Sequence, residues 1–279
     1  MFQKFFLLLI LISFTLEIIE YNNGNESEIF QCKEEITQSP IDIKFYEFKE
    51  EKNTIKENTT LKYIKGFFPP LYGEKLDENL EMSINKNQMA RSYILYNNVS
   101  CVYNAKKLRV HIFAEHTFEN NKNDIEIQIM HKKESNSKLI CPDNLGISIF
   151  FSSQNNKVSN VINKFYRVNE DEKEDIFQRY NLTDVTSLDL NKYTNDNSDY
   201  YWYFGSGTFP KKDKLTFTSC DEVLWILFNK VRDISEEELK ALIISTMNIY
   251  PNGNSRTTGN EDSIRNSQNI EVFYDKNSS

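Results

Sequence analysis

The segment from residue 124 to residue 130 constrains the fold most, because its apolar and polar residues alternate. Its apolar positions are Ile125, Ile127 and Ile129, and the intervening ones are Asp124, Glu126, Gln128 and Met130. Successive side chains of a strand point to opposite faces of a sheet. This period of two therefore predicts a β-strand whose two faces differ in chemistry.

Other short apolar runs indicate further strands, and only one segment shows a clear helix start. The run Leu145–Phe151, bounded by Pro142, is nearly continuous and predicts a fully buried strand. Ser235 is followed three residues later by Glu238, which is a capping box at the start of a helix. The remaining strand-like runs are 93–96, 108–113 and 223–228. We therefore expect a mainly β (α+β), sheet-dominated single domain.

Size and charge agree with one acidic, folded domain. The 279 residues are 39% hydrophobic and 13% aromatic, which is enough for one large core. The net charge is -8, whereas nucleic acids and anionic membranes bind basic surfaces. We therefore expect no nucleic-acid partner.

The N-terminus predicts export. Lys4 precedes the unbroken apolar run Phe5–Ile12, which is too short for a comfortable membrane span. Residues 1–20 are interpreted as a signal peptide without a clear cleavage site, and an uncleaved signal anchor is the alternative. No other segment is apolar enough to span a bilayer, so we expect a secreted protein or one in the lumen of the secretory pathway.

Cysteines and glycosylation sequons fit such a compartment. The cysteines form an even set, and an oxidising compartment favours pairing them, with three pairings possible. Their spacing does not resemble a zinc knuckle. The cysteines are Cys32, Cys101, Cys141 and Cys220, and the candidate glycosylation sites are Asn25, Asn58, Asn98 and Asn181.

Several motifs occur in order along the chain. They are QSPIDI at 38–43, EHT at 115–117, IEIQIMH at 125–131, YFGSGTFP at 203–210, ISEEEL at 234–239 and the closing segment 269–273. Together they resemble the α-carbonic anhydrase family over a domain of residues 30–275. The resemblance implies a large twisted, mostly antiparallel sheet of about ten strands with short surface helices.

The same resemblance implies a disulfide pairing. Secreted members often link a cysteine just before the QSPI motif to one near the segment that corresponds to 203–210 here, and Cys32 and Cys220 occupy about those places. This leaves Cys101 to pair with Cys141.

The resemblance also locates a metal site whose residues have changed. The family's zinc requires three neutral imidazoles, two from an H-x-H pair on one strand and one from its neighbour. In this chain the corresponding positions hold Arg109, His111 and Gln128. We expect no zinc cofactor, because a guanidinium is always charged and carries only donors.

The other histidines cannot complete a three-histidine site. His116 belongs to the EHT motif, where the resemblance implies a structural role with Tyr203 as partner. His131 lies three residues beyond Gln128, so strand alternation places it on the opposite face. His111 alone is better interpreted as a hydrogen-bonded core residue than as a ligand.

Arg109 requires a partner if it is buried. We expect it to pair with Glu126, which in the family orients the third histidine, or with Glu115. The alternative is that its long side chain reaches solvent through the cleft. Thr208 and Glu115 match the family's pair that orients the zinc-bound hydroxide, and here we expect them to be vestigial and structural.

These residues favour a non-catalytic, carbonic anhydrase-related binding or structural module over an enzyme. Its ligand would be an extracellular protein or a small anion drawn to Arg109. The alternative is an active zinc carbonic anhydrase, a lyase, with an atypical site of His111, Gln128 and a carboxylate. An esterase using Glu115 and Thr208 has almost no support.

Overall fold

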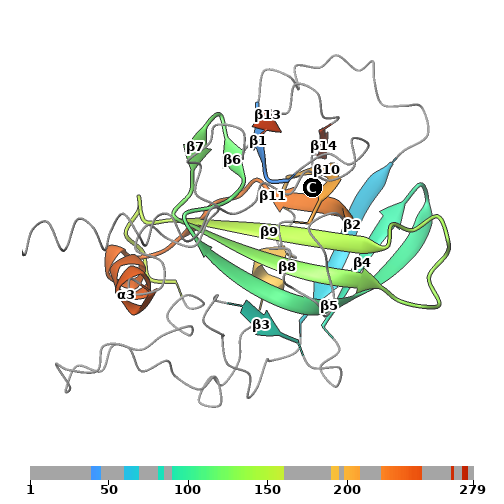
Figure 1. The fold of residues 1–279 in the computed structure, drawn as a ribbon, viewed down its shortest axis with the longest axis horizontal. Coiled ribbons are helices and arrows are strands. Elements are labelled where there is room, and N and C mark those ends of the chain that lie inside the picture. Colours follow the sequence, from blue (N-terminus) through green and yellow to red (C-terminus); the bar gives the residue numbers. More distant parts are fainter. Residues whose placement is uncertain are drawn as a thin grey trace, which may run out of the picture.

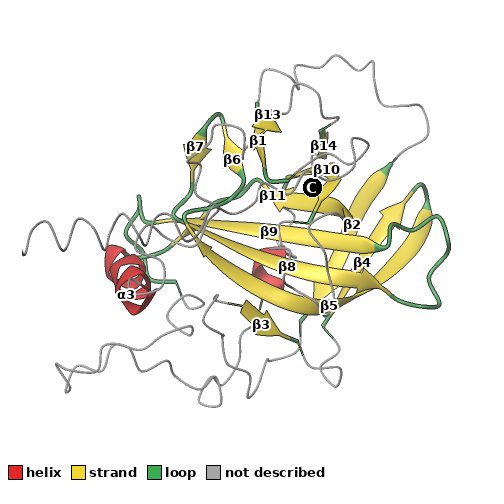
Figure 2. Cartoon of the chain, in the orientation of Figure 1, coloured by secondary structure: helices red, strands yellow, loops and turns green. Residues whose placement is uncertain are grey.

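Two β-sheets organise the protein, as Figures 1 and 2 show. The computed structural model describes residues 39–44, 60–68, 81–84, 90–159, 190–194, 198–207, 221–246, 265–266 and 272–275. The strands are β1 (Ile41–Ile43), β2 (Leu61–Phe67), β3 (Glu81–Ser83), β4 (Arg91–Tyr96), β5 (Val99–Ile112), β6 (Thr117–Phe118), β7 (Asn121–Lys122), β8 (Ile125–Lys133), β9 (Asn144–Ser152), β10 (Tyr200–Ser206), β11 (Glu222–Phe228), β12 (Arg232–Asp233), β13 (Arg265–Asn266) and β14 (Phe273–Asp275). The described helices are α2 (Asn191–Thr194) and α3 (Glu236–Thr246).

The larger sheet has 10 strands among the described residues, in the order β14-β10-β11-β9-β8-β5-β4-β2, with β12 beside β9 and β3 beside β5. Most neighbours are antiparallel, and β11 and β12 run parallel to β9. A smaller sheet has the order β13-β1-β6-β7. The expected mainly β fold with a large, mostly antiparallel sheet is confirmed.

Both faces of the central strands are buried, because each face packs against its own group of side chains. On β8, Ile125, Ile127 and Ile129 enter the larger apolar cluster, whereas Met130 enters a second cluster on the other face. Glu126 and Gln128 lie on the Met130 side and are also fully buried. The alternation thus separates an apolar face from a face that carries polar side chains.

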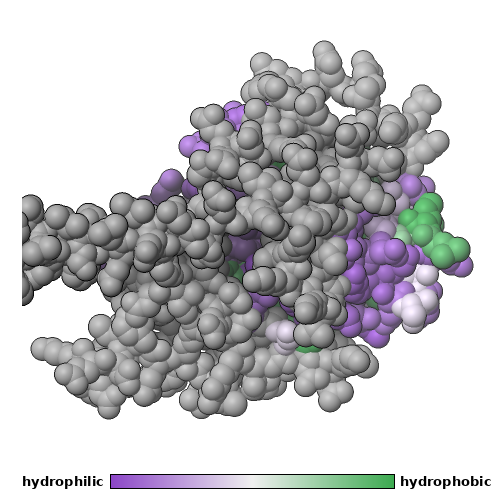
Figure 3. Space-filling model, in the orientation of Figure 1, coloured by the Kyte–Doolittle hydropathy of each residue, from purple (hydrophilic) through white to green (hydrophobic). Residues whose placement is uncertain are grey.

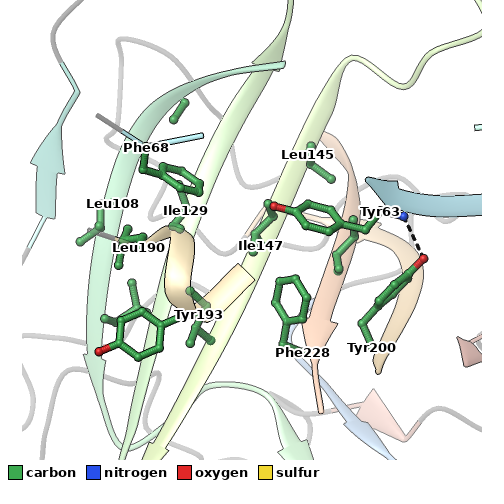
Figure 4. Packing of buried hydrophobic residues seen from close by; sticks show 14 of the residues in the cluster. Tyr63, Phe68, Leu108, Ile129, Leu145, Ile147, Leu190, Tyr193, Tyr200 and Phe228 are labelled. Carbon is green, nitrogen blue, oxygen red and sulfur yellow. Dashed lines mark hydrogen bonds between the residues drawn. The ribbon is translucent and has the colours of Figure 1, made fainter. Parts of the chain in front are cut away.

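The larger cluster connects the two halves of the sheet (Figure 4). Tyr63 on β2 and Tyr200 on β10 lie in it with Phe228, and their rings meet edge to face. The backbone N–H of Tyr63 donates to the Tyr200 hydroxyl at 2.9 Å. This hydrogen bond ties an edge strand to a strand far from it in the sheet order.

The expected capping box begins helix α3. The backbone N–H of Glu238 donates to Ser235 Oγ at 3.1 Å, and the backbone N–H of Ser235 donates to Glu238 Oε2 at 2.8 Å. These reciprocal bonds satisfy two groups that lack partners at a helix start. No helix in the described part of the chain is long and apolar enough to cross a membrane.

One disulfide joins the start of β5 to the loop between β8 and β9. Cys101 and Cys141 are bonded, with their Cα atoms 5.8 Å apart, which confirms that pairing. Cys32 and Cys220 lie outside the described residues, as does the signal segment 1–20.

Candidate functional site

The polar residues of the site lie on adjacent strands in the middle of the large sheet. In the register of β5 and β8, Arg109 is opposite Gln128 and His111 is opposite Glu126. Leu108 and its alternate neighbours on β5 fill the larger apolar cluster, so Arg109 and His111 share the face that carries Glu126 and Gln128. Pairing between two neighbouring strands therefore brings these side chains together.

The Glu126 carboxylate is the centre of the site, because it accepts five hydrogen bonds. Its Oε2 accepts from the backbone N–H groups of Glu115 at 2.8 Å and His116 at 3.0 Å. Its Oε1 lies 2.7 Å from His116 Nδ1 and accepts from Gln128 Nε2 at 3.0 Å and Ser148 Oγ at 2.7 Å. A buried carboxylate with this many donors is held in one orientation.

These contacts keep Glu126 ionised. Burial by itself raises the pKa of its carboxyl, but the nearby His116 ring, its hydrogen bond to Glu126, and the His111 and Ser148 side chains together lower that pKa to about 2. The site therefore contains a fixed negative charge across the physiological pH range.

A chain of hydrogen bonds extends from Glu126 to Ser39, two residues before β1. His116 Nε2 lies 2.7 Å from the Tyr203 hydroxyl, which in turn lies 2.9 Å from Ser39 Oγ. Gly205 makes this approach possible, because a Cβ there would come within 2.3 Å of Ser39 Oγ. Tyr203 is thus the partner that the sequence pointed to for His116.

Gln128 spans the two acidic residues of the site. Its Nε2 donates to Glu115 Oε2 at 3.1 Å and to Glu126 Oε1 at 3.0 Å. An amide nitrogen carries two hydrogens and no accepting lone pair, so both of its donors are used and it is unable to bind a cation. Only the Gln128 oxygen could act as a ligand.

His111 is buried beside this bridge. Its Nε2 lies 3.6 Å from Glu115 Oε2, the same oxygen that accepts from Gln128. Glu115 is therefore shared between the strand that carries His111 and the strand that carries Gln128.

Arg109 pairs with a residue that the sequence did not point to. Its Nε lies 2.5 Å from Glu81 Oε1 on β3, and Lys107 Nζ lies 3.5 Å from the other oxygen of Glu81. Glu126 accepts from Gln128, Ser148 and the EHT segment, and Glu115 contacts Gln128 and His111. Arg109 is only 8% exposed, which argues against a side chain that reaches solvent.

Glu81 was missed because β3 has only three residues and no apolar period. Its place beside β5 comes from long-range pairing, in which Glu81 is opposite Arg109. The signal that could have found it is chemical, since a buried arginine and a buried lysine two residues apart require a carboxylate on a neighbouring strand.

The remaining predicted residues fall in two groups. His131 lies on the opposite face of β8, where Ser92 Oγ is 2.9 Å from its Nε2, and burial lowers the pKa of His131 to about 4. Outside the described residues lie Thr208, Asn25, Asn58 and Asn181. No group of three or more His, Cys, Asp or Glu side chains that could hold a metal ion occurs among the residues the structure describes.

Comparison with protein families gives one match over most of the chain. The sequence model described as "Eukaryotic-type carbonic anhydrase" matches residues 23–272. A comparison with curated protein sequences gives no significant match.

Solved structures with a similar fold include two carbonic anhydrases and dioscorin. A carbonic anhydrase from Dunaliella salina aligns with a TM-score of 0.60 and 15% identity over 91% of this chain and 96% of its own. Dioscorin complexed with ascorbate aligns with a TM-score of 0.57 and 19% identity over 87% of each chain. The α-carbonic anhydrase of Thermovibrio ammonificans aligns with a TM-score of 0.51 and 20% identity over 85% of this chain and 86% of its own. At these identities the likeness concerns the fold alone.

Proposed function

This chain belongs to the eukaryotic-type carbonic anhydrase family, and from that premise we propose that it is a secreted, non-catalytic member of it. In this proposal a buried polar network replaces the zinc site, and the protein acts as a binding or structural module outside the cell. The support comes from the residues at the three zinc positions and from the contacts that each of them makes.

Zinc, where it is bound in this family, lowers the pKa of a water molecule to about 7 and so supplies hydroxide for attack on carbon dioxide. Three neutral imidazoles hold it. The positions here carry Arg109, His111 and Gln128, so one imidazole remains. This donor set does not fit the metal.

The ion pair of Arg109 carries the proposal. A guanidinium at a zinc position places a permanent positive charge where the metal's charge would be, and the two charges repel. Glu81 stabilises the guanidinium in the site, at 2.5 Å from Nε. Glu81 also contacts Lys107 at 3.5 Å, so the cation is part of a buried charge cluster.

The Gln128 bridge gives independent support. Both hydrogens of its amide are donated to Glu115 and Glu126, at 3.1 and 3.0 Å. In the family, the carboxylate at the position of Glu126 orients the third histidine. Here it holds an amide and the His116–Tyr203 pair, which is a purely structural use of the same frame.

The ligand of such a module is proposed to be an extracellular protein. A small anion attracted to Arg109 would have to compete with Glu81, whose carboxylate already contacts that guanidinium from within the chain. A protein partner would bind through the surface and would not require an open pocket at the former metal position.

An active enzyme with an atypical site is the second candidate. The observation that favours it is the convergence of His111 and Gln128 on Glu115 Oε2, at 3.6 and 3.1 Å. Imidazole and carboxylate groups both bind zinc, whereas a neutral amide is a weak ligand. The amide nitrogen that faces Glu115 here is a donor, which argues against this candidate.

Zinc content and carbon dioxide hydration activity distinguish the non-catalytic module from the atypical enzyme. The full chain, purified from secreting cells and dialysed against buffered zinc, is measured by atomic spectroscopy and in a stopped-flow carbon dioxide hydration assay. We expect substoichiometric zinc and the rate of buffer alone. Stoichiometric zinc with turnover well above buffer would overturn the proposal. The matched control is the Arg109→His/Gln128→His variant, which restores the three imidazoles and is expected to retain zinc.

A further inference from the structure

We propose that Asn98 carries an N-linked glycan, and that this glycan covers the apolar tip formed by Leu139 and Ile140. The inference rests on the proposed passage through the secretory pathway. It concerns an exposed, apolar part of the surface, apart from the buried polar site. Each part follows from described residues at one end of the large sheet.

Asn98 lies at the tip of the hairpin that joins β4 and β5, in the sequon Asn98-Val99-Ser100. Asn98 and Ser100 are exposed. The backbone of Asn98 has a φ of 61°, a left-handed conformation that asparagine tolerates better than most residues. The acceptor amide therefore stands on a regular turn, accessible to a transferase.

The preceding turn residue, Asn97, anchors the turn that carries Asn98. The side-chain oxygen of Asn97 accepts from the backbone N–H of Thr60 at 2.7 Å, and the backbone N–H of Asn97 donates to the Thr60 carbonyl at 2.7 Å. These bonds anchor the turn to the start of β2 through Asn97. The turn is thus fixed on one side while the Asn98 side chain faces solvent.

The apolar tip is on the loop between β8 and β9. Leu139 is 98% exposed and Ile140 is 50% exposed, and Figure 3 shows an apolar patch at the end of the molecule where Figure 1 places this loop. These two adjacent aliphatic side chains form a small apolar patch that a covering group would shield from water.

The hairpin and the tip are held side by side by several bonds. Cys101, three residues after Asn98, is bonded to Cys141, which directly follows Ile140. Ser137 Oγ donates to the Val102 carbonyl at 3.1 Å and accepts from its backbone N–H at 3.2 Å. A sugar chain attached at Asn98 therefore begins at the end of the sheet where Leu139 and Ile140 lie, and it is placed to cover them.

The modification is a group transfer from a lipid-linked oligosaccharide diphosphate. A bond forms between Asn98 Nδ2 and C1 of the first sugar, and the bond from C1 to the diphosphate oxygen breaks. The lipid diphosphate leaves with the bonding electrons, and the amide loses one proton to the medium. No oxidant or metal from this chain is required.

Peptide mapping of the full chain secreted from eukaryotic cells tests the modification. Digestion with peptide-N-glycosidase converts a glycosylated asparagine to aspartate, which mass spectrometry locates. We expect the conversion at residue 98 in the natural chain and in Ser100→Thr, which keeps the sequon, and its loss in Ser100→Ala. An unmodified Asn98 in the natural chain would overturn the proposal, whether or not the variants fold.

A dye that fluoresces on apolar surfaces tests the covering. Removal of the glycan under native conditions is expected to raise binding of anilinonaphthalene sulfonate to the natural chain, and to leave it unchanged in Leu139→Ser/Ile140→Ser. Equal dye binding before and after removal would overturn the covering role. The zinc measurement above is independent of both results, so the two proposals fail separately.

Discussion

Glu81 places one carboxylate between two buried cations, and this arrangement determines what single substitutions at the site will do. The side chains of Glu81, Lys107 and Arg109 are 12, 9 and 9% exposed, so none of the charges is well solvated by bulk water. Removing Glu81 alone takes away the carboxylate that both cations share, whereas removing Arg109 as well leaves only Lys107 to lose that contact.

A double-mutant cycle on Glu81 and Arg109 should therefore be strongly non-additive. Glu81→Ala is expected to lower the free energy of unfolding by about 3 kcal/mol, since the buried Lys107 and Arg109 lose the carboxylate that they share. Glu81→Ala/Arg109→Ala is expected to cost less than the sum of the single variants by at least about 1 kcal/mol. Urea unfolding followed by circular dichroism measures this, and additive costs would show that the pair is not coupled.

His131 should make stability depend on pH. Burial lowers its pKa to about 4 from 6.5, so the unfolded chain binds the proton more readily than the folded chain between those values. Stability is then highest above about pH 6.5 and falls as the pH is lowered toward 4, by up to about 3 kcal/mol for a shift of this size.

The variant His131→Gln should remove that dependence while keeping a polar group beside Ser92. Glu126 acts in a lower window, since its pKa is lowered to about 2 and its contribution is lost only as the pH falls below its ordinary value. Urea midpoints measured from pH 7 to pH 4 check this. The same slope in both proteins would show that His131 is not responsible.

At the scale of the elements, β9 packs against β11 at a contact that permits no side chain. Gly146 is paired in register with Trp225, and a Cβ on Gly146 would come within 2.5 Å of the indole ring. Trp225 is fully buried and donates its Nε1–H to the Ser206 carbonyl at 3.0 Å, so the ring has little freedom to move.

Gly146→Ala is therefore expected to destabilise the fold by about 1–3 kcal/mol through overpacking. Adding Trp225→Phe provides a smaller ring, so the cost of Gly146→Ala should be lower in that background than in the natural chain. Denaturant midpoints of the four proteins give both costs. An equal cost in the two backgrounds would place the strain elsewhere.

The elements predictable from sequence are those whose own pattern determines their structure. The alternation around Ile127 predicted β8, the apolar run around Ile147 predicted β9, and Ser235 with Glu238 predicted the start of α3. β3 and β6 have only three and two residues, and each pairs with a strand distant in the sequence, β5 and β1 respectively. The partner of Arg109 lies on one of these, which is why sequence located the guanidinium and not its counter-ion.

At the scale of the whole molecule, the large sheet expected for the family is present, and its centre contains a buried polar network. Glu126, His116 and Tyr203 form one connected chain of hydrogen bonds on the buried face of the central strands. The same strands place Arg109 and Gln128 at the proposed zinc positions. The fold is thus compatible with the proposed binding or structural role, which depends on the surface and stability of the protein and requires no catalysis at the buried polar site.

The most direct test is the effect of zinc on thermal stability. A ligand that binds only the folded state raises the melting temperature by mass action. We predict no change in the melting temperature of the natural chain on adding zinc at neutral pH, and a clear rise for Arg109→His/Gln128→His. A saturable rise in the natural chain, abolished by His111→Ala, would contradict the proposed loss of the zinc site.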